Sequence, residues 1–135
     1  MKRRADGQSR WLVRLALSSV LAELAGAIIW LRWRYSRYAV TGGSMEPALF
    51  EGDFVIVDRK AFSRRLPRPG EVILATDPRE PSRTLVKRVT WVDLHGQLWL
   101  EGDNDEESTD SRAFGRVPPR TLVGRVVFRY WPLLR

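Results

Sequence analysis

The chain has 135 residues, 44% of them hydrophobic and 29% charged, and it contains no cysteine. These values predict one compact folded domain and exclude disulfides, a thiol nucleophile and a cysteine-ligated zinc. The net charge of the chain is +7. Residues 1–43 hold eight basic and two acidic groups and so contribute +6 of it, which leaves only +1 for residues 44–135. A nucleic-acid-binding domain carries its basic patch on the folded body, so this distribution argues against a nucleic-acid partner and favours a membrane surface.

The N-terminal segment is apolar. Residues 15–31 contain only two serines and Glu23 as polar side chains. As a helix, residues 11–33 would be roughly 34 Å long, enough to cross a hydrocarbon core of about 30 Å. Tryptophans near both ends suit the aromatic belts of a membrane span. Residues 1–38 are therefore predicted to form a basic N-terminus and a single transmembrane helix.

Two alternatives to a transmembrane helix stay open. A helix lying on the bilayer or packed on a partner would avoid burying Glu23, whose charge costs up to about 3 kcal/mol at a helix centre. A cleaved signal peptide is disfavoured, because the apolar run continues past the small residues 25–27. Four basic residues before the helix favour a cytoplasmic N-terminus, but three basic residues after it oppose this orientation.

Short β patterns separated by turns follow. The predicted strands cover residues 54–57, 71–75, 84–92, 98–100 and 122–131. Such closely spaced strands predict a mainly β fold, a compact antiparallel β-barrel or sandwich over residues 39–135. Residues 101–112 are polar and acidic and predict a loop. This loop lacks the glycine that an EF-hand requires at its sixth position, so no metal is expected there.

Ser44 is the candidate nucleophile. It directly follows Gly42 and Gly43, which permit a sharp backbone path and the close approach of another chain. Met45 and Leu49 could line an apolar pocket beside it. An ordinary Gly-Gly turn with a helix-capping serine explains the same residues, so both interpretations stay open at this point.

Lys87 is the candidate base, because a serine hydroxyl is a weak nucleophile without one. The single histidine, His95, lies in a predicted turn with no special surroundings. On a strand, Lys87 shares a face with Leu85 and Val89, whereas Arg88 faces away. Burial on an apolar face would lower the pKa of the amine. An edge-strand lysine with its ammonium in water is the alternative.

Three sequence boxes together resemble the type I signal peptidase family. Residues 43–47, followed by Gly52-Asp53, are similar to the serine box of that family, and residues 86–89 are similar to its lysine box. Residues 102–118 match the third box at the expected spacing, and residues 124–132 also fit. The resemblance covers nearly everything from residue 39 onward.

The resemblance implies a β-rich catalytic domain with a Ser/Lys dyad, in which neutral Lys87 takes the proton of Ser44. It implies that Asp110 and Arg112 form an ion pair that holds the third box. Ser108 would hydrogen-bond Lys87 and aim its amine at the serine. The rest of the supporting set is Gly102, Asp103 and Asn104. Substrate would bind as an added strand against residues 40–43, which include Gly42 and Gly43, and residues 84–86. Shallow pockets for small residues near the cleaved bond could be formed by Val40, Met45, Leu49, Leu85 and Val86.

The expected activity is that of a membrane-anchored serine endopeptidase, which removes N-terminal signal or leader peptides through an acyl-enzyme. Its partners would be membrane lipid and preproteins with small residues near the cleaved bond, and no cofactor is expected. The protein would be a single-pass membrane protein with its catalytic domain on the non-cytoplasmic side.

Two departures from the family pattern keep alternatives open. Some members carry a hydroxyl residue as second oxyanion donor where this chain has Gly42, and the interval from Lys87 to Gly102 is short. In size the chain is closer to mitochondrial inner-membrane peptidases and nickel superoxide dismutase maturation proteases. One alternative is therefore a dedicated maturation protease that trims the N-terminal extension of one client. The other is a non-catalytic, membrane-tethered binding module.

Overall fold

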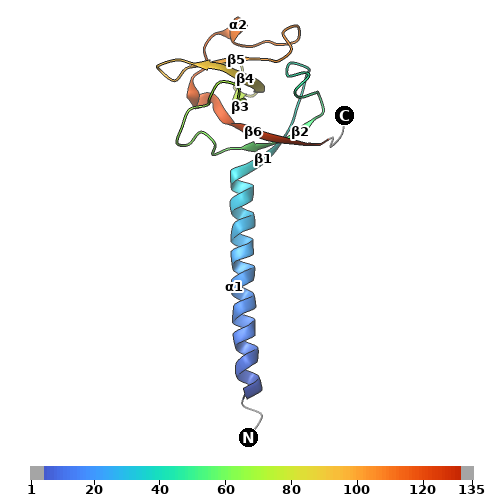
Figure 1. The fold of residues 1–135 in the computed structure, drawn as a ribbon, viewed down its shortest axis with the longest axis vertical. Coiled ribbons are helices and arrows are strands. Elements are labelled where there is room, and N and C mark those ends of the chain that lie inside the picture. The colour runs from blue at the N-terminus through green and yellow to red at the C-terminus, as the bar shows by residue number, and fades with distance from the viewer. Residues whose placement is uncertain (1–4, 132–135) are drawn as a thin grey trace. The chain divides into compact units, whose positions relative to one another are not determined.

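The computed structural model describes residues 5–131, with side chains from residue 11 onward. The chain divides into two compact units, one ending at Arg34 and the other beginning at Tyr35. Figure 1 shows a single long helix in the first unit and a sheet with short helical turns in the second.

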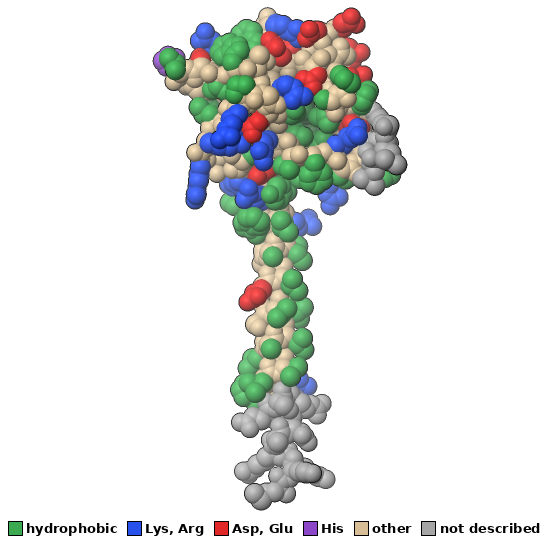
Figure 2. Space-filling view, viewed as in Figure 1, with side chains coloured by type: hydrophobic (Ala, Val, Ile, Leu, Met, Phe, Trp, Pro, Cys, Tyr) green, Lys and Arg blue, Asp and Glu red, His purple; other side chains and the backbone are tan. Residues whose placement is uncertain are grey.

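The first unit consists of one helix, α1 (Ala5–Arg34). By length and composition, residues 11–34 are able to cross a membrane. Their large apolar side chains are exposed along the helix (Figure 2). Ser18 and Ser19 donate their hydroxyls to carbonyl groups three residues earlier, at 2.9 and 2.8 Å, so these polar groups are satisfied within the helix. The helix starts before the predicted residue 11 because apolar content marks only the part suited to lipid.

The second unit is a six-stranded antiparallel sheet with strand order β1-β2-β6-β3-β4-β5 (Figure 1). The strands are β1 (Tyr35–Ala39), β2 (Phe54–Asp58), β3 (Val72–Thr76), β4 (Thr84–Val92), β5 (Leu98–Glu101) and β6 (Leu122–Trp131). A short helix, α2 (Ser111–Phe114), and a 3-10 turn, η1 (Pro119–Thr121), precede β6. The predicted mainly β, antiparallel fold behind one apolar helix is confirmed. Its strands form a single open sheet rather than a closed barrel.

Most strand positions follow from the sequence pattern. The predictions for residues 84–92 and 122–131 match β4 and β6 at both ends, and the other three predicted strands lie within one residue of the observed bounds. Strand β1 was not among the predicted strands, because residues 35–38 were assigned to the anchor segment and only residues 38–41 had an extended pattern. Its identity as a strand comes from pairing with β2, in which Tyr35 lies opposite Asp58 and Ala39 opposite Phe54.

The sheet is buried on both faces in its central part. Successive residues of a strand point to opposite faces, and on β3 Leu74 joins one core cluster while its neighbours Ile73 and Ala75 join the other. The first cluster holds Val40, Met45, Leu49, Val55, Val57, Leu74 and Val86. The second holds Ile73, Ala75, Val89, Leu98, Leu100 and Val117. The second cluster packs on the sheet face that also carries Lys87, which is paired with Ile73.

Candidate active site

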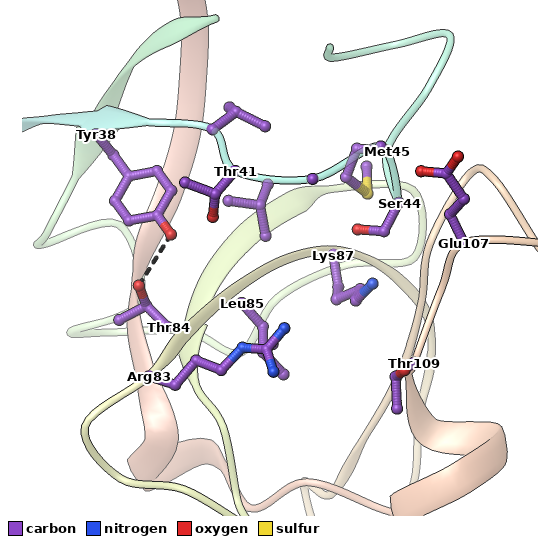
Figure 3. Close-up of a pocket in the computed structure, with 14 residues that line it drawn as sticks. Tyr38, Thr41, Ser44, Met45, Arg83, Thr84, Leu85, Lys87, Glu107 and Thr109 are labelled. Atoms are coloured by element: carbon purple, nitrogen blue, oxygen red, sulfur yellow. Dashed lines mark hydrogen bonds between the residues drawn. The ribbon is translucent and has the colours of Figure 1, made fainter. Parts of the chain in front are cut away.

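A cavity of about 170 Å³ lies between the segment after β1, the start of β4 and the loop after β5 (Figure 3). Among the predicted site residues, those that line it are Val40, Gly42, Gly43, Ser44, Met45, Leu85, Val86 and Lys87. Leu49 was predicted to bind substrate, but its side chain is buried in the core and does not line the cavity. The cavity thus brings the candidate nucleophile and the candidate base to one space.

Ser44 lies in a loop that is closed at its base by backbone pairing. Val40 N–H donates to the Asp53 carbonyl at 2.8 Å, and Gly52 N–H donates to the Val40 carbonyl at 2.9 Å. Gly42 has a φ of +77°, a conformation that residues with a Cβ rarely adopt. Met45 is 1% exposed, so its side chain anchors the loop in the core while the preceding serine faces the cavity (Figure 3).

Lys87 lies in the middle of β4 and is 3% exposed. Its Nζ donates to the Ser108 hydroxyl at 2.9 Å. Burial lowers the pKa of the Lys87 amine, because it disfavours the charged form. The negative charge of Asp110 opposes this shift, while three cations reinforce it: Arg83, Arg112 and Arg79. The amine is therefore buried, but its direct hydrogen-bond partner is a hydroxyl.

Asp110 organises the loop behind the lysine. Its carboxylate accepts hydrogen bonds from the Ser108 hydroxyl at 2.5 Å, from Gly102 N–H at 3.0 Å and from the Arg112 guanidinium at 2.6 and 2.9 Å. Burial alone would raise the pKa of Asp110, but these hydrogen bonds together hold it well below its usual range. The carboxylate is therefore ionised at neutral pH.

The direction of these hydrogen bonds bears on the amine. The Ser108 hydroxyl gives its single proton to Asp110, so it can only accept from Lys87. A neutral amine that donates one N–H to Ser108 keeps its lone pair for another proton. The hydrogen bond to Ser108 therefore leaves the lone pair of a neutral Lys87 amine unused.

The remaining supporting residues join the third box to the other two. A Cβ on Gly102 would meet the Ser108 hydroxyl and the Ser44 carbonyl, so only glycine fits between them. Asp103 forms an ion pair with Arg88 at 2.6 Å, and Asn104 N–H donates to the Ser44 carbonyl at 3.1 Å. The loop thus contacts the serine loop and the lysine strand at once.

Six further residues line the cavity that were not named as site residues from the sequence: Tyr38, Thr41, Arg83, Thr84, Glu107 and Thr109. The Thr84 hydroxyl donates to the Tyr38 hydroxyl at 3.0 Å and links the two walls at one end (Figure 3). Glu107 lies over Gly43, where an added Cβ would meet its carboxylate. Thr41 and Thr84 lie in the two segments predicted to hold the substrate, residues 40–43 and 84–86. Glu107 belongs to the acidic run of residues 103–107, and nothing in the sequence distinguishes it from its neighbours.

No group of three or more His, Asp or Glu side chains among the described residues is placed to hold a metal ion. The Ser44 hydroxyl and the Lys87 amine share the cavity with other polar side chains, those of Tyr38, Thr41, Arg83, Thr84, Glu107 and Thr109.

Comparison with known proteins gives related findings. A family model described as signal peptidase, peptidase S26, matches residues 10–92 and 94–131. Mitochondrial inner membrane protease subunit 1 of Xenopus tropicalis is 34% identical over 112 residues, covering 69% of this chain and 67% of that protein. The human subunit 1 is 31% identical over 113 residues, covering 69% and 68%. Thylakoidal processing peptidase 1 of Arabidopsis thaliana is 35% identical over 83 residues, covering 61% of this chain and 22% of that protein.

Proposed function

Because the chain belongs to the signal peptidase family S26, we propose that it is a membrane-anchored serine endopeptidase that removes N-terminal signal or leader peptides. The boundary predicted at residue 38 moves to residue 34 in this proposal, because Tyr35–Ala39 form β1 of the sheet. Residues 1–34 would anchor the protein, and residues 35–135 would form the peptidase domain. The observation that carries the proposal is the shared cavity, in which Ser44 faces a buried lysine hydrogen-bonded to Ser108.

Lys87 is the general base of the proposed reaction. Desolvation destabilises its ammonium form, so a larger fraction of the amine is neutral near pH 7–8 than for a lysine in water. The neutral amine takes the proton of the Ser44 hydroxyl as the oxygen attacks the scissile carbonyl carbon. The resulting ammonium then gives its proton to the leaving amine, and the peptide C–N bond breaks.

The tetrahedral intermediate needs donors for its negative oxygen. Ser44 N–H has no hydrogen-bond acceptor within residues 5–131, so it is available for this role. After the amine product leaves, a water molecule attacks the Ser44 ester, with Lys87 again accepting a proton. The products are the shortened protein, the released leader and the regenerated hydroxyl.

The substrate would bind as an extended strand between residues 40–43 and residues 84–86. Strand β5 pairs with β4 only from Arg88 onward, so the first part of β4 has no strand partner on that side among the described residues. Its backbone groups line the cavity beside Leu85 and Val86. The small cavity favours small side chains, such as alanine, near the cleaved bond.

Helix α1 and the names of the matched relatives support a proposal on where the protein is located in the cell. The matched relatives are named as inner-membrane and thylakoidal peptidases, and α1 is able to span a membrane. We place the peptidase domain on the non-cytoplasmic side, where the mature parts of exported preproteins emerge.

The test is cleavage of a membrane-inserted model preprotein with an Ala-x-Ala site by the purified full chain in vesicles. Ser44→Ala and Lys87→Ala should each abolish cleavage, because one removes the attacking oxygen and the other the base. Lys87→Arg should also fail, because arginine stays protonated. Circular dichroism would establish that each variant is folded.

Ser82→Ala and Arg120→Ala are the matched controls, since both residues are exposed and lie outside the cavity. They should cleave at the wild-type rate. Cleavage by folded Ser44→Ala would refute the serine mechanism. A wild-type chain that binds the preprotein without cutting it would identify a binding module instead.

A further inference from the structure

The loop between β2 and β3 contains a basic segment, residues 59–68. It holds Arg59, Lys60, Arg64, Arg65 and Arg68 and no acidic residue. Residues 101–107, in contrast, hold five acidic residues and no basic one. The sheet unit is nearly neutral in sum, so its charges are separated rather than absent. Figure 2 shows acidic side chains along one rim of this unit and basic side chains gathered toward the opposite side.

The basic segment is held in place but leaves charge available. Arg65 forms two hydrogen bonds with Glu71, at 2.7 and 2.9 Å, which tie the segment to the start of β3. Arg59, Arg64 and Arg68 are exposed, and within the described part of the chain none of these three has an ion-pair partner. Three solvated arginines without an ion-pair partner among the described residues fit an anionic surface.

Apolar groups lie among these charges. Leu66 is 44% exposed, and the Arg65 guanidinium lies 5.3 Å from the centre of the Phe62 ring. A shallow cavity joins the two kinds of side chain. It is lined by Arg59, Lys60, Phe62, Ser63, Arg65 and Leu66, together with apolar residues of η1 and β6. Cations beside apolar groups match a lipid headgroup, in which phosphate adjoins glycerol and the first methylenes.

The chain places this segment next to the attachment point of the helix. Its first residue, Arg59, follows Asp58, which is the cross-strand partner of Tyr35. Partners across an antiparallel pair lie roughly 5 Å apart, and Tyr35 is bonded to Arg34, the last residue of α1. If α1 crosses a membrane, the basic segment therefore begins close to the membrane surface in either orientation of the helix.

From this combination we propose that residues 59–68 form a docking surface for anionic membrane lipids. The arginines bind lipid phosphates, and Leu66 contacts the boundary with the acyl chains. The surface lies outside the cavity of Ser44 and Lys87, and the proposal does not depend on peptidase activity.

The test uses the full chain in vesicles of phosphatidylcholine alone or mixed with phosphatidylglycerol. Because the chain has no cysteine, Ser63→Cys provides a single site for a fluorophore, and Leu94→Cys provides a control site in the exposed turn after β4. Nitroxide-labelled headgroups serve as the quencher. Quenching at residue 63 should rise several-fold with phosphatidylglycerol and fall again in high salt, while residue 94 should not respond.

Two double variants that remove the same charge then distinguish docking by residues 59–68 from the general attraction of a positively charged protein to anionic vesicles. Arg64→Gln with Arg68→Gln should weaken docking by roughly five-fold per arginine. Arg79→Gln with Arg116→Gln removes the same charge from residues that are paired with Asp77 and Asp93, and it should leave docking unchanged. Equal loss in both pairs, or no response to phosphatidylglycerol, would overturn the proposal.

Hydrogen exchange of the unlabelled chain checks that the label has not created the effect. Amides of residues 59–68 should be protected in phosphatidylglycerol vesicles only. If inorganic phosphate added to phosphatidylcholine vesicles protects them equally, the segment binds free anions and the lipid assignment is wrong.

Discussion

Lys87 is a buried amine whose protonation costs the folded state free energy. The side chain is 3% exposed, and burial disfavours its ammonium form. An apolar side chain at this position would avoid that cost. In the proposed mechanism the same destabilisation is useful, because it keeps part of the amine neutral for proton transfer.

Lys87→Met should therefore stabilise the fold in a pH-dependent way. Below the lowered pKa of the folded state, Lys87 is charged in both states, and the folded state bears the full penalty. The penalty shrinks as pH rises from that lowered pKa toward the unfolded value of 10.5, and it vanishes above. The free energy of unfolding of Lys87→Met minus that of wild type should thus be largest below the lowered pKa of Lys87 and decline as pH rises toward 10.5, as measured by urea unfolding.

Lys60→Met is the control for this measurement. It replaces an exposed lysine, so any change with pH that both variants share is not caused by burial of the Lys87 amine. A Lys87→Met difference that stayed constant from neutral to alkaline pH would mean that the amine is solvated in the folded protein, and the proposed base would lose its physical support.

At the scale of elements, the loop from β5 to α2 is held by one carboxylate. Asp110 caps α2 by accepting from Arg112 N–H, and it also accepts from Gly102, Ser108 and the Arg112 side chain. Residues on both sides of the acidic loop therefore depend on Asp110. A short helix of four residues has little stability of its own, so this cap fixes its position.

Asp110→Asn should destabilise the sheet unit by about 2–3 kcal/mol, because an amide cannot accept all these donors and leaves buried groups unpaired. Asp105→Asn is the matched control. Asp105 pairs with the same Arg112, but its side chain is 78% exposed, so the expected loss is below about 1 kcal/mol. Chemical denaturation at pH 7 measures both, and similar losses would show that Asp110 has no special role.

The stability lost in Asp110→Asn should depend on pH, and the direction of this dependence follows from the pKa of Asp110. Since the pKa of Asp110 is lowered in the folded state, its stabilisation is complete above the unfolded value of 3.8. It is lost as pH falls through the lower folded value. The difference in the free energy of unfolding between wild type and Asp110→Asn should therefore become smaller in acid.

These elements show how far sequence patterns reach. The alternation in residues 84–92 correctly predicted that Leu85, Lys87 and Val89 share a buried face, because period-2 patterning is a local property. The position of β6 between β2 and β3 was not predictable in this way, because strand order depends on contacts distant in sequence. The position of Glu107 at the cavity was not predictable for the same reason, because its loop folds back over Gly43, which is distant in sequence.

At the scale of the whole molecule, the helix and the sheet unit have separate sources of stability. Both core clusters consist of residues from the sheet unit alone, and the apolar side chains of α1 are exposed. The candidate catalytic residues and their hydrogen-bond partners also lie in the sheet unit. The helix is therefore expected to supply location rather than folding energy or chemistry.

Removal of residues 1–34 should leave a chain that folds and cleaves a soluble Ala-x-Ala peptide about as fast as the full protein. Processing of a membrane-inserted preprotein should fall roughly a hundred-fold or more at dilute enzyme, since a shared membrane raises the effective concentration of the two partners. The two substrates are compared at equal enzyme concentration, with circular dichroism as the measure of folding. An unfolded truncated chain would mean that α1 contributes to the core, whereas undiminished processing of the membrane-inserted preprotein would mean that the anchor has no part in substrate encounter.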